Sequence, residues 1–535
     1  MKATNPSYQR SAFRALDRFV DQYMHAMKSP GMTLVLADRS GVLRTCTYGS
    51  RDLDGKVAVD PDELFHIGSI GKSLTAIAIL QLMDEGKLDL STPLSCYLPW
   101  AKIETPYQPI TIHHLLTHTS GLPRTVPVFL SDSRARHTPG FAPGKYFYYS
   151  NLGYDLLGYL ISTLDRRSYA ESIQRRILEP LGMHSTAPGI TPDTYHRTIP
   201  SYTVDRVGLS YNRHGTLRQA PVLICTKASA SIASTAGDMG IFINMLLNRG
   251  EGLRERILSE RSFGLLVNPF VKAEGFGPTA CYGYGLAIDQ MDEHRIARHT
   301  GGTVSFMSSL QVDLDGGIGV FASINSMQGY RPDPVTNYAL RVLRAQQQGN
   351  PASTPLFTNR GGVIENASDY EGCFTSSSGE QLEFLADGDR LYLMYQSHFL
   401  PVEITAGSCF LVSHPDFVDC LVTFVRENGS VIEASCRGEW YMHDEYSALQ
   451  SFPVCEELTP FEGHYHNDSP WLGSLTIAQR RGRLWLNGMI PLEPIRLNVF
   501  SLADIPYNPE WIQFLDVVDH HSMHLKFSGE DYWRI

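Results

Sequence analysis

Residues 65–80 read FHIGSIGKSLTAIAIL and join a serine and a lysine to an apolar helical run. Residues three apart on a helix lie on one face, so the Lys72 amine can reach the Ser69 hydroxyl. A serine hydroxyl becomes a useful nucleophile when a neighbouring group accepts its proton. Free N–H groups and the positive dipole end at a helix start favour negative charge that develops there. The spacing predicts a nucleophile with its base, although an isolated S-x-x-K is also typical of a capped surface helix.

Two further motifs follow along the chain. Residues 149–151 read YSN, after the turn-rich PGK at 143–145 and before another apolar run. Residues 299–302 read HTGG and precede the strand-like TVSF at 303–306. Loops that enter helices often carry reactive groups, and glycines in a strand let another molecule approach its backbone closely. The chain therefore offers three groups of polar side chains that one site can collect.

In this order the three motifs resemble the serine hydrolases related to class C β-lactamases and penicillin-binding proteins. That family carries S-x-x-K, then Y-x-N, then K-T-G or H-x-G. Further stretches resemble the same family, namely IHHLLTHTSGLP at 112–123, ILEPLGM at 177–183 and ASTAGDM at 233–239. Strand-like segments at both ends of this region, with helical segments between them, predict an α+β domain in which an antiparallel sheet, built from distant segments, lies beside a helical cluster.

The resemblance implies the site. Its catalytic residues are Ser69, Lys72 and Tyr149, and its substrate-binding residues are Asn151, His299, Gly301, Gly302 and Thr303. Tyr149 would return the proton to the leaving group, and whether Lys72 or Tyr149 takes the first proton stays open. Asn151 would orient Lys72 and donate to the substrate carbonyl. The oxyanion hole would use the N–H of Ser69 and one from the strand near Gly302 or Thr303.

The function that follows is a serine hydrolase, which forms an acyl-enzyme on Ser69 and acts on small esters, amides or short peptides, as an esterase or a D-aminopeptidase does. Many β-lactamases and transpeptidases have lysine where this chain has His299, and a histidine is mostly neutral near pH 7. Efficient β-lactamase or carboxypeptidase activity is therefore in doubt. The alternatives are an acyltransferase or peptide cyclase that uses the same acyl-enzyme, a β-lactamase or carboxypeptidase, and a non-catalytic ligand-binding protein.

A metal-dependent hydrolase is a further alternative, because His114 and His118 are four residues apart and His113 is adjacent. A glutamate as in H-E-x-x-H is missing from this stretch, and the sequence offers no third ligand. We expect neither a metal nor a cofactor.

The composition and net charge argue against several classes of partner. A net charge of −11 argues against a nucleic-acid binder, whose footprint is a basic face. Apolar runs fall short of the roughly 18 residues that a membrane helix needs. Residues 1–27 lack a continuous apolar segment typical of a signal peptide, and nine scattered cysteines lack a C-x-x-C pair. We expect a cytoplasmic protein with reduced cysteines, a small-molecule substrate and no membrane or nucleic-acid partner.

The length of 535 residues predicts several domains. Residues 1–345 would form the hydrolase domain and residues 346–362, rich in Gln, Gly, Pro, Asn and Ser, a linker. Beyond it, YEGCF at 370–374 parallels FEGHY at 461–465, and DRLYL at 389–393 parallels GRLWL at 482–486. A repeat of about 90 residues with short strands predicts two small antiparallel β-barrels, at 363–455 and 456–535. They resemble the lipocalin-like barrels of three-domain D-stereospecific aminopeptidases.

Overall fold

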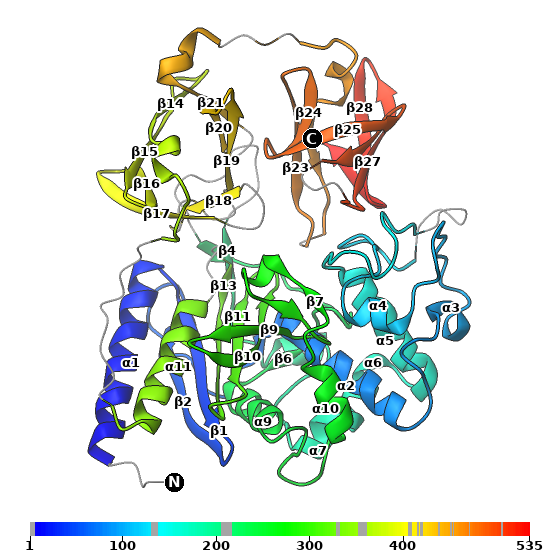
Figure 1. The fold of residues 1–535 in the computed structure, drawn as a ribbon, viewed down its shortest axis with the longest axis vertical. Helices are drawn as coiled ribbons and strands as arrows, with labels where there is room; N and C mark the ends of the chain where they lie inside the picture. The colour runs from blue at the N-terminus through cyan, green and yellow to red at the C-terminus, as the bar shows by residue number, and fades with distance from the viewer. Residues whose placement is uncertain are drawn as a thin grey trace. The chain divides into compact units, whose positions relative to one another are not determined.

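The structure is a computed structural model. It describes residues 6–535 except 130–136, 205–216, 328–331, 351–360, 405–408, 413, 415–416, 418–420, 437–438, 450–451, 453, 470 and 504–506. The described residues form two compact units, one within residues 6–203 and 218–350 and one within residues 361–535 together with Val204 and Leu217 (Figure 1).

The first unit is built on an antiparallel sheet. Among the described residues its eight strands pair in the order β2-β1-β12-β11-β10-β9-β8-β7. Their bounds are β1 Gly31–Asp38, β2 Gly41–Gly49, β7 Val271–Lys272, β8 Cys281–Tyr282, β9 Ala287–Met291, β10 His294–Gly302, β11 Met307–Asp313 and β12 Ile318–Ile324. Because β1 pairs with β12, with Met32 opposite Ile324, the sheet joins strands from both ends of the unit.

Helices cover both faces of this sheet. The helices in the described part of this unit are α1 Pro6–Ala26, α2 Gly71–Asp84, α3 Leu94–Tyr97, α4 Ile112–Leu116, α5 Asn151–Asp165, α6 Tyr169–Ile173, α7 Glu179–Leu181, α8 Pro192–Tyr195, α9 Ala236–Leu247, α10 Glu260–Leu266 and α11 Asp333–Gln347. Side chains of a strand alternate between faces, so Leu34 and Leu36 of β1 pack with α1 and α11, while Val35 and Ala37 face the larger core that contains α2, α5 and α9. Figure 1 shows α1 and α11 side by side next to β1 and β2.

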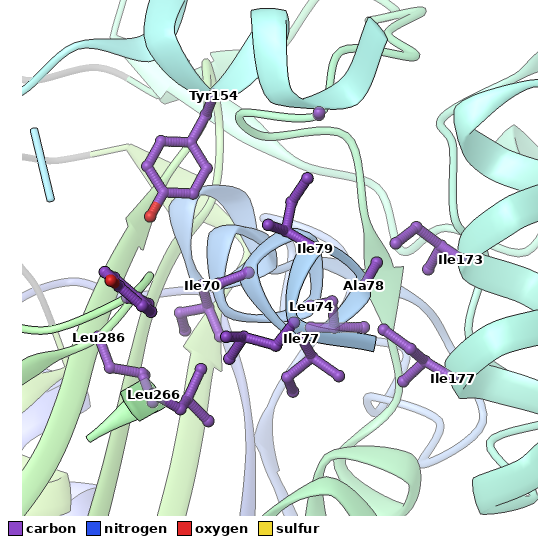
Figure 2. Packing of buried hydrophobic residues seen from close by; sticks show 14 of the residues in the cluster. Ile70, Leu74, Ile77, Ala78, Ile79, Tyr154, Ile173, Ile177, Leu266 and Leu286 are labelled. Carbon is purple, nitrogen blue, oxygen red and sulfur yellow. The ribbon is translucent and has the colours of Figure 1, made fainter. Parts of the chain in front are cut away.

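Helix α2 runs through the middle of the larger core. Ile70, Leu74 and Ile77 are fully buried and are surrounded by apolar side chains from other elements, Ile173, Ile177, Leu266 and Leu286 among them (Figure 2). A helix that is apolar on every side is stable only when protein surrounds it. Lys72 in its first turn, and Ser69 in the 3-10 turn that leads into it, are therefore held by a rigid and well-packed element.

The second unit contains two closed antiparallel barrels, each of eight strands in the described residues. The first comprises β14 Gly372–Ser376, β15 Gln381–Asp387, β16 Arg390–Tyr395, β17 His398–Ile404, β18 Cys409–Val412, β19 Leu421–Glu427, β20 Ser430–Cys436 and β21 Glu439–His443. The second comprises β22 Gly463–His466, β23 Ser474–Arg480, β24 Arg483–Leu486, β25 Ile490–Arg496, β26 Val499–Leu502, β27 Trp511–Val518, β28 His521–Phe527 and β29 Glu530–Arg534.

The barrels repeat one design at corresponding glycines. Gly372 and Gly463 each open the first strand with a positive φ, 139° and 153°. A Cβ at Gly372 would clash with His443 of the last strand of its barrel, and one at Gly463 with Arg534 of the last strand of the other. Buried aromatic side chains fill each interior, Phe374, Phe384 and Phe410 in the first and Phe461, Phe500 and Phe514 in the second.

The predicted fold class, an α+β hydrolase domain followed by two small antiparallel barrels, is confirmed. One difference is that α11 continues to Gln347, two residues beyond the expected domain end, and most of the expected linker lies outside the described residues. Another is that Cys436 is disulfide-bonded, so the expectation that every cysteine is reduced is wrong there. Across the described part of the chain, none of the helices has the length and apolar character needed to span a membrane.

Candidate active site

Ser69 lies on a short turn that leads directly into α2. The preceding strand β3, Phe65–His66, pairs with β6, Ala233–Ser234, and the 3-10 turn Gly68–Ile70 follows. Residues 68–70 form the nucleophile turn, named for the role that the Ser-x-x-Lys motif predicts for Ser69. Ser69 is half-buried, whereas both of its neighbours are buried. The rigid helix behind it and the short strand before it fix the position of the hydroxyl.

The nucleophile turn lies against the end of strand β10, and glycines on both sides permit the contact. Gly68 has a φ of +53°, and a Cβ there would lie 2.7 Å from the backbone nitrogen of Gly302. A Cβ at Gly301 would overlap the backbone oxygen of Ile67. We expected Gly301 to make room for a substrate, but its missing side chain makes room for the protein's own turn.

Backbone hydrogen bonds at the end of β10 distinguish the two candidate N–H donors of the oxyanion hole, Gly302 and Thr303. The Thr303 N–H donates to the Phe306 carbonyl at 3.0 Å, so it is already engaged with the β10–β11 hairpin. Paired and unpaired N–H groups alternate along an antiparallel strand, which turns the Gly302 N–H away from β11. Because β9 pairs with β10 only as far as Arg298, this edge faces the nucleophile turn. Gly302 therefore fits the oxyanion role, and the Thr303 N–H does not.

The Lys72 amine is fully buried and has three polar neighbours. Its Nζ lies 3.0 Å from Ser69 Oγ, 2.8 Å from Asn151 Oδ1 and 2.7 Å from the Ser229 carbonyl oxygen. Burial lowers the pKa of Lys72 to about 7, although the Asp155 carboxylate opposes the shift. A lysine in this state can lose its proton near neutral pH and serve as a base.

The YSN motif lies at the start of α5. The Ser150 side chain caps the helix by accepting from the Gly153 N–H, and this cap orients the first helical residue, Asn151, toward Lys72. The Asn151 amide nitrogen donates to Thr125 Oγ1 at 3.1 Å. The ring of Tyr149 lies with its centroid 4.9 Å from Lys72 Nζ. The structure therefore brings Tyr149 and Asn151 together around the amine.

His118 contacts the YSN motif through a hydrogen bond and through ring packing. It is fully buried, and its Nδ1 accepts from the Ser150 N–H at 3.0 Å. Its ring lies 4.2 Å from that of Tyr149, centroid to centroid. Burial and the nearby Lys72 hold the pKa of His118 well below its usual range, so the imidazole is neutral and carries its proton on Nε2. Among the described residues, Nε2 has no hydrogen-bond partner.

His299 lies on β10 and is engaged with the protein through both ring nitrogens. Its Nδ1 lies 2.6 Å from the Thr300 carbonyl oxygen, and a carbonyl only accepts, so Nδ1 carries a proton. In the neutral imidazole, Nε2 then accepts from the Tyr282 hydroxyl at 3.0 Å. The ring is buried among aromatic neighbours, with the Phe276 centroid 5.3 Å away.

The histidines of the metal alternative have three different surroundings. Helix α4 ends at Leu116, so His118 lies beyond it with a φ of +57° and does not share a helical face with His114. His113 Nδ1 pairs with the Tyr284 hydroxyl at 2.8 Å, and His114 Nδ1 accepts from the Thr111 N–H at 3.1 Å. The residues that the structure describes contain no group of three or more His, Cys, Asp or Glu arranged to hold a metal ion.

Several residues of the site were not identified from the sequence. Ser229 contributes a carbonyl, which any residue type has, so no sequence signal marks it. Tyr282 and Phe276 lie in a segment without a motif. His118 drew attention only as a metal ligand, although its place in the stretch 112–123 was a usable signal.

Most of the first unit is similar in sequence to known proteins. The family model described as Beta-lactamase matches residues 16–345. The chain is 32% identical over 200 residues to the protein flp of Staphylococcus aureus strain N315, a match that covers 35% of this chain and 39% of flp. It is 27% identical over 337 residues to the D-alanyl-D-alanine-carboxypeptidase/endopeptidase AmpH of Escherichia coli K12, covering 58% of this chain and 83% of AmpH.

Among solved structures, the fold is similar to that of the octameric penicillin-binding protein homologue from Pyrococcus abyssi. The TM-score is 0.59 at 24% identity, and the match covers 80% of this chain and 99% of the other.

Proposed function

Because the chain belongs to the β-lactamase family of serine hydrolases, we propose that it forms an acyl-enzyme on Ser69 and hydrolyses small esters, amides or short peptides.

The arrangement of acceptors around Lys72 carries the proposal. A neutral amine has two N–H donors and one lone pair. Asn151 Oδ1 and the Ser229 carbonyl oxygen only accept, so they take the two N–H groups. The lone pair is then left for the Ser69 hydroxyl, 3.0 Å away. This is the hydrogen-bond pattern that a resting base needs in order to accept the proton of its nucleophile.

The reaction follows from these positions. As Ser69 Oγ bonds to the substrate carbonyl carbon, its proton passes to Lys72 Nζ and the carbonyl π pair moves to oxygen. The N–H groups of Ser69 and Gly302 would hold that oxyanion. The intermediate then collapses, and the leaving group departs with a proton from Lys72, by way of Tyr149. Water repeats the sequence on the acyl-enzyme and releases the acid.

His299 supports a preference for substrates without a carboxylate beside the scissile bond. A lysine at this place would offer a permanent positive charge to such a group. His299 is instead buried, and its two nitrogens are used by Thr300 and Tyr282. We therefore expect esters and aminoacyl amides to react faster than β-lactams or peptides that end in a free D-alanine.

A second candidate is a D-alanyl-D-alanine carboxypeptidase, which the relationship to AmpH favours. Four substrates separate the candidates: a short-chain p-nitrophenyl ester, a D-aminoacyl anilide, nitrocefin and a D-alanyl-D-alanine peptide. The proposal predicts the highest kcat/KM for the ester or the anilide. A preference for the D-alanyl-D-alanine peptide would establish the second candidate, and a preference for nitrocefin would overturn both.

A further inference from the structure

Asp155 is a buried carboxylate one helical turn after Asn151. Its exposed fraction is 6%, and its Oδ1 accepts from the Ser229 N–H at 3.0 Å. The carbonyl of the same Ser229 accepts from Lys72 Nζ at 2.7 Å. One residue of an irregular segment therefore connects a carboxylate on α5 with the amine on α2.

The segment that carries Ser229 is packed tightly between these two helices. Gly158 of α5 faces Ala228, and a Cβ at Gly158 would lie 2.5 Å from that of Ala228. From the other side, Thr75 Oγ1 of α2 donates to the Ala228 carbonyl at 3.1 Å. With so little room on either side, Asp155 and Lys72 are held at fixed positions on opposite ends of Ser229.

The groups that face Asp155 come from several elements. Those that titrate and interact with it electrostatically are Lys72 of α2, Lys227 and Cys225 of the segment before β6, Tyr159 of α5 and Tyr169 of α6. Burial raises the pKa of the Asp155 carboxyl above its usual range, while the hydrogen bonds from Ser229 and the charges of Lys227 and Lys72 oppose this shift and favour the ionised carboxylate. The thiol and the two phenols are neutral at ordinary pH, because burial raises the pKa of each.

The groups that face Lys72 are equally few. Asp155 is the carboxylate whose charge bears on it, the buried His118 is neutral, and the ring centroids of Tyr149 and Tyr154 lie 4.9 and 5.6 Å from Nζ. Burial alone disfavours a charged amine, by several pKa units for a fully buried lysine. A single carboxylate at this place therefore has a large influence on the charge of Lys72.

We propose that ionised Asp155 is a positioning residue for Lys72, which it serves by anchoring Ser229 and by stabilising the Lys72 ammonium through its negative charge. The inference rests on the proposed function, in which Lys72 is the base. Burial lowers the pKa of Lys72 and the Asp155 charge raises it, and the result of about 7 lies near the pH at which a general base works best. Without Asp155, Lys72 would be neutral over a wider range but a weaker base.

The test measures how the rate of Ser69 phosphonylation by a fluorophosphonate depends on pH, in the full-length protein, by intact-mass spectrometry. Asp155→Asn keeps an acceptor for the Ser229 N–H and removes the charge. Loss of the charge lowers the pKa of Lys72, so the acidic limb of the profile should move to lower pH, by about one unit. The rate at high pH should fall, because the amine is less basic.

Asp238→Asn is the matched control. Asp238 is also buried and accepts backbone N–H groups, from Ser185 at 2.9 Å and Thr186 at 2.7 Å, but it belongs to the start of α9. Its variant should keep the wild-type midpoint. Asp155→Ala provides a second variant without the charge and should shift the limb in the same direction. The midpoint of the acidic limb is determined from the chains that react with the fluorophosphonate. A preparation in which some chains are unfolded therefore still gives this midpoint.

The outcomes distinguish a failure of the proposed function from a failure of the role assigned to Asp155. If wild-type Ser69 is not labelled, the proposed function fails. If Ser69 is labelled and its acidic limb is the same in wild type and Asp155→Asn, the role of Asp155 is overturned while the proposed function stands. A shift of equal size in Asp238→Asn would also overturn it, because the effect would then not be specific to Asp155.

Discussion

Gly301 and Ile67 are in backbone contact, so that a single methyl group on Gly301 would overlap the Ile67 carbonyl oxygen. Gly301 belongs to strand β10 and Ile67 immediately precedes the nucleophile turn. The distance between the Ser69 hydroxyl and the Gly302 N–H is thereby set by a contact without side chains. A contact of this kind has no rotamers to adjust, so the geometry of the proposed nucleophile and the proposed oxyanion donor is rigid.

The first prediction is that Gly301→Ala disables the site. The added methyl group must displace β10 from the nucleophile turn, and a displacement of about 1 Å at a catalytic group can cost about 10²-fold in rate. Esterase kcat/KM of the purified variant measures this. Gly264→Ala is the control, because a Cβ at Gly264, exposed on α10, meets no atom within 4 Å. Equal activity of both variants would contradict the role of this contact.

The second prediction concerns the base. Lys72 must be neutral to accept a proton, and its pKa lies at about 7, so kcat/KM should rise with pH on an acidic limb centred near neutrality. Lys72→Arg keeps a cation but cannot lose its proton in this range, and we expect a loss of about 10²–10⁴-fold. A variant that retained wild-type kcat/KM would exclude Lys72 as the base.

The third prediction is that His118 holds the YSN motif through its acceptor atom. His118→Phe keeps a ring but leaves the buried Ser150 N–H without its acceptor, which costs about 1–3 kcal/mol of folding stability. His118→Asn retains an acceptor and tolerates the φ of +57°. Urea unfolding should show a larger loss for the Phe variant. The reverse order would indicate that ring packing on Tyr149 matters more than the hydrogen bond.

The fourth prediction is independence from metal. The proton transfer assigned to Lys72 needs no metal ion, and His113, His114 and His118 have separate partners. Dialysis against a strong chelator should leave ester hydrolysis unchanged. If chelation abolished activity and added zinc restored it, the prediction would be contradicted, and the reaction would be assigned to a metal site instead of Ser69.

The features that could be predicted from the sequence are those that depend on residue type and short-range spacing. Ser69 lies on the 3-10 turn that continues into α2, and Lys72 follows three residues later, so their contact follows from helical spacing alone. The barrels were predictable because their repeat places equivalent residues, such as Gly372 and Gly463, at equivalent turns.

Long-range contacts to backbone atoms were not predictable in the same way. The Ser229 carbonyl is 157 residues from Lys72, and a carbonyl has no signature in a sequence. The choice of Gly302 over Thr303 as the oxyanion donor depends on which N–H groups are already hydrogen-bonded in the β10–β11 hairpin. That can be known only from the register of the two strands. One partner of His299, Tyr282, lies on a separate strand, β8, and emerged only from the structure.

The account depends most on Ser69 as the nucleophile. Incubation with a fluorophosphonate, followed by intact-mass spectrometry and peptide mapping, should show one adduct per chain, located on Ser69. Ser69→Ala should show no adduct and essentially no ester hydrolysis, with unchanged folding by circular dichroism. An adduct on another serine, or full hydrolytic activity of Ser69→Ala, would contradict the account.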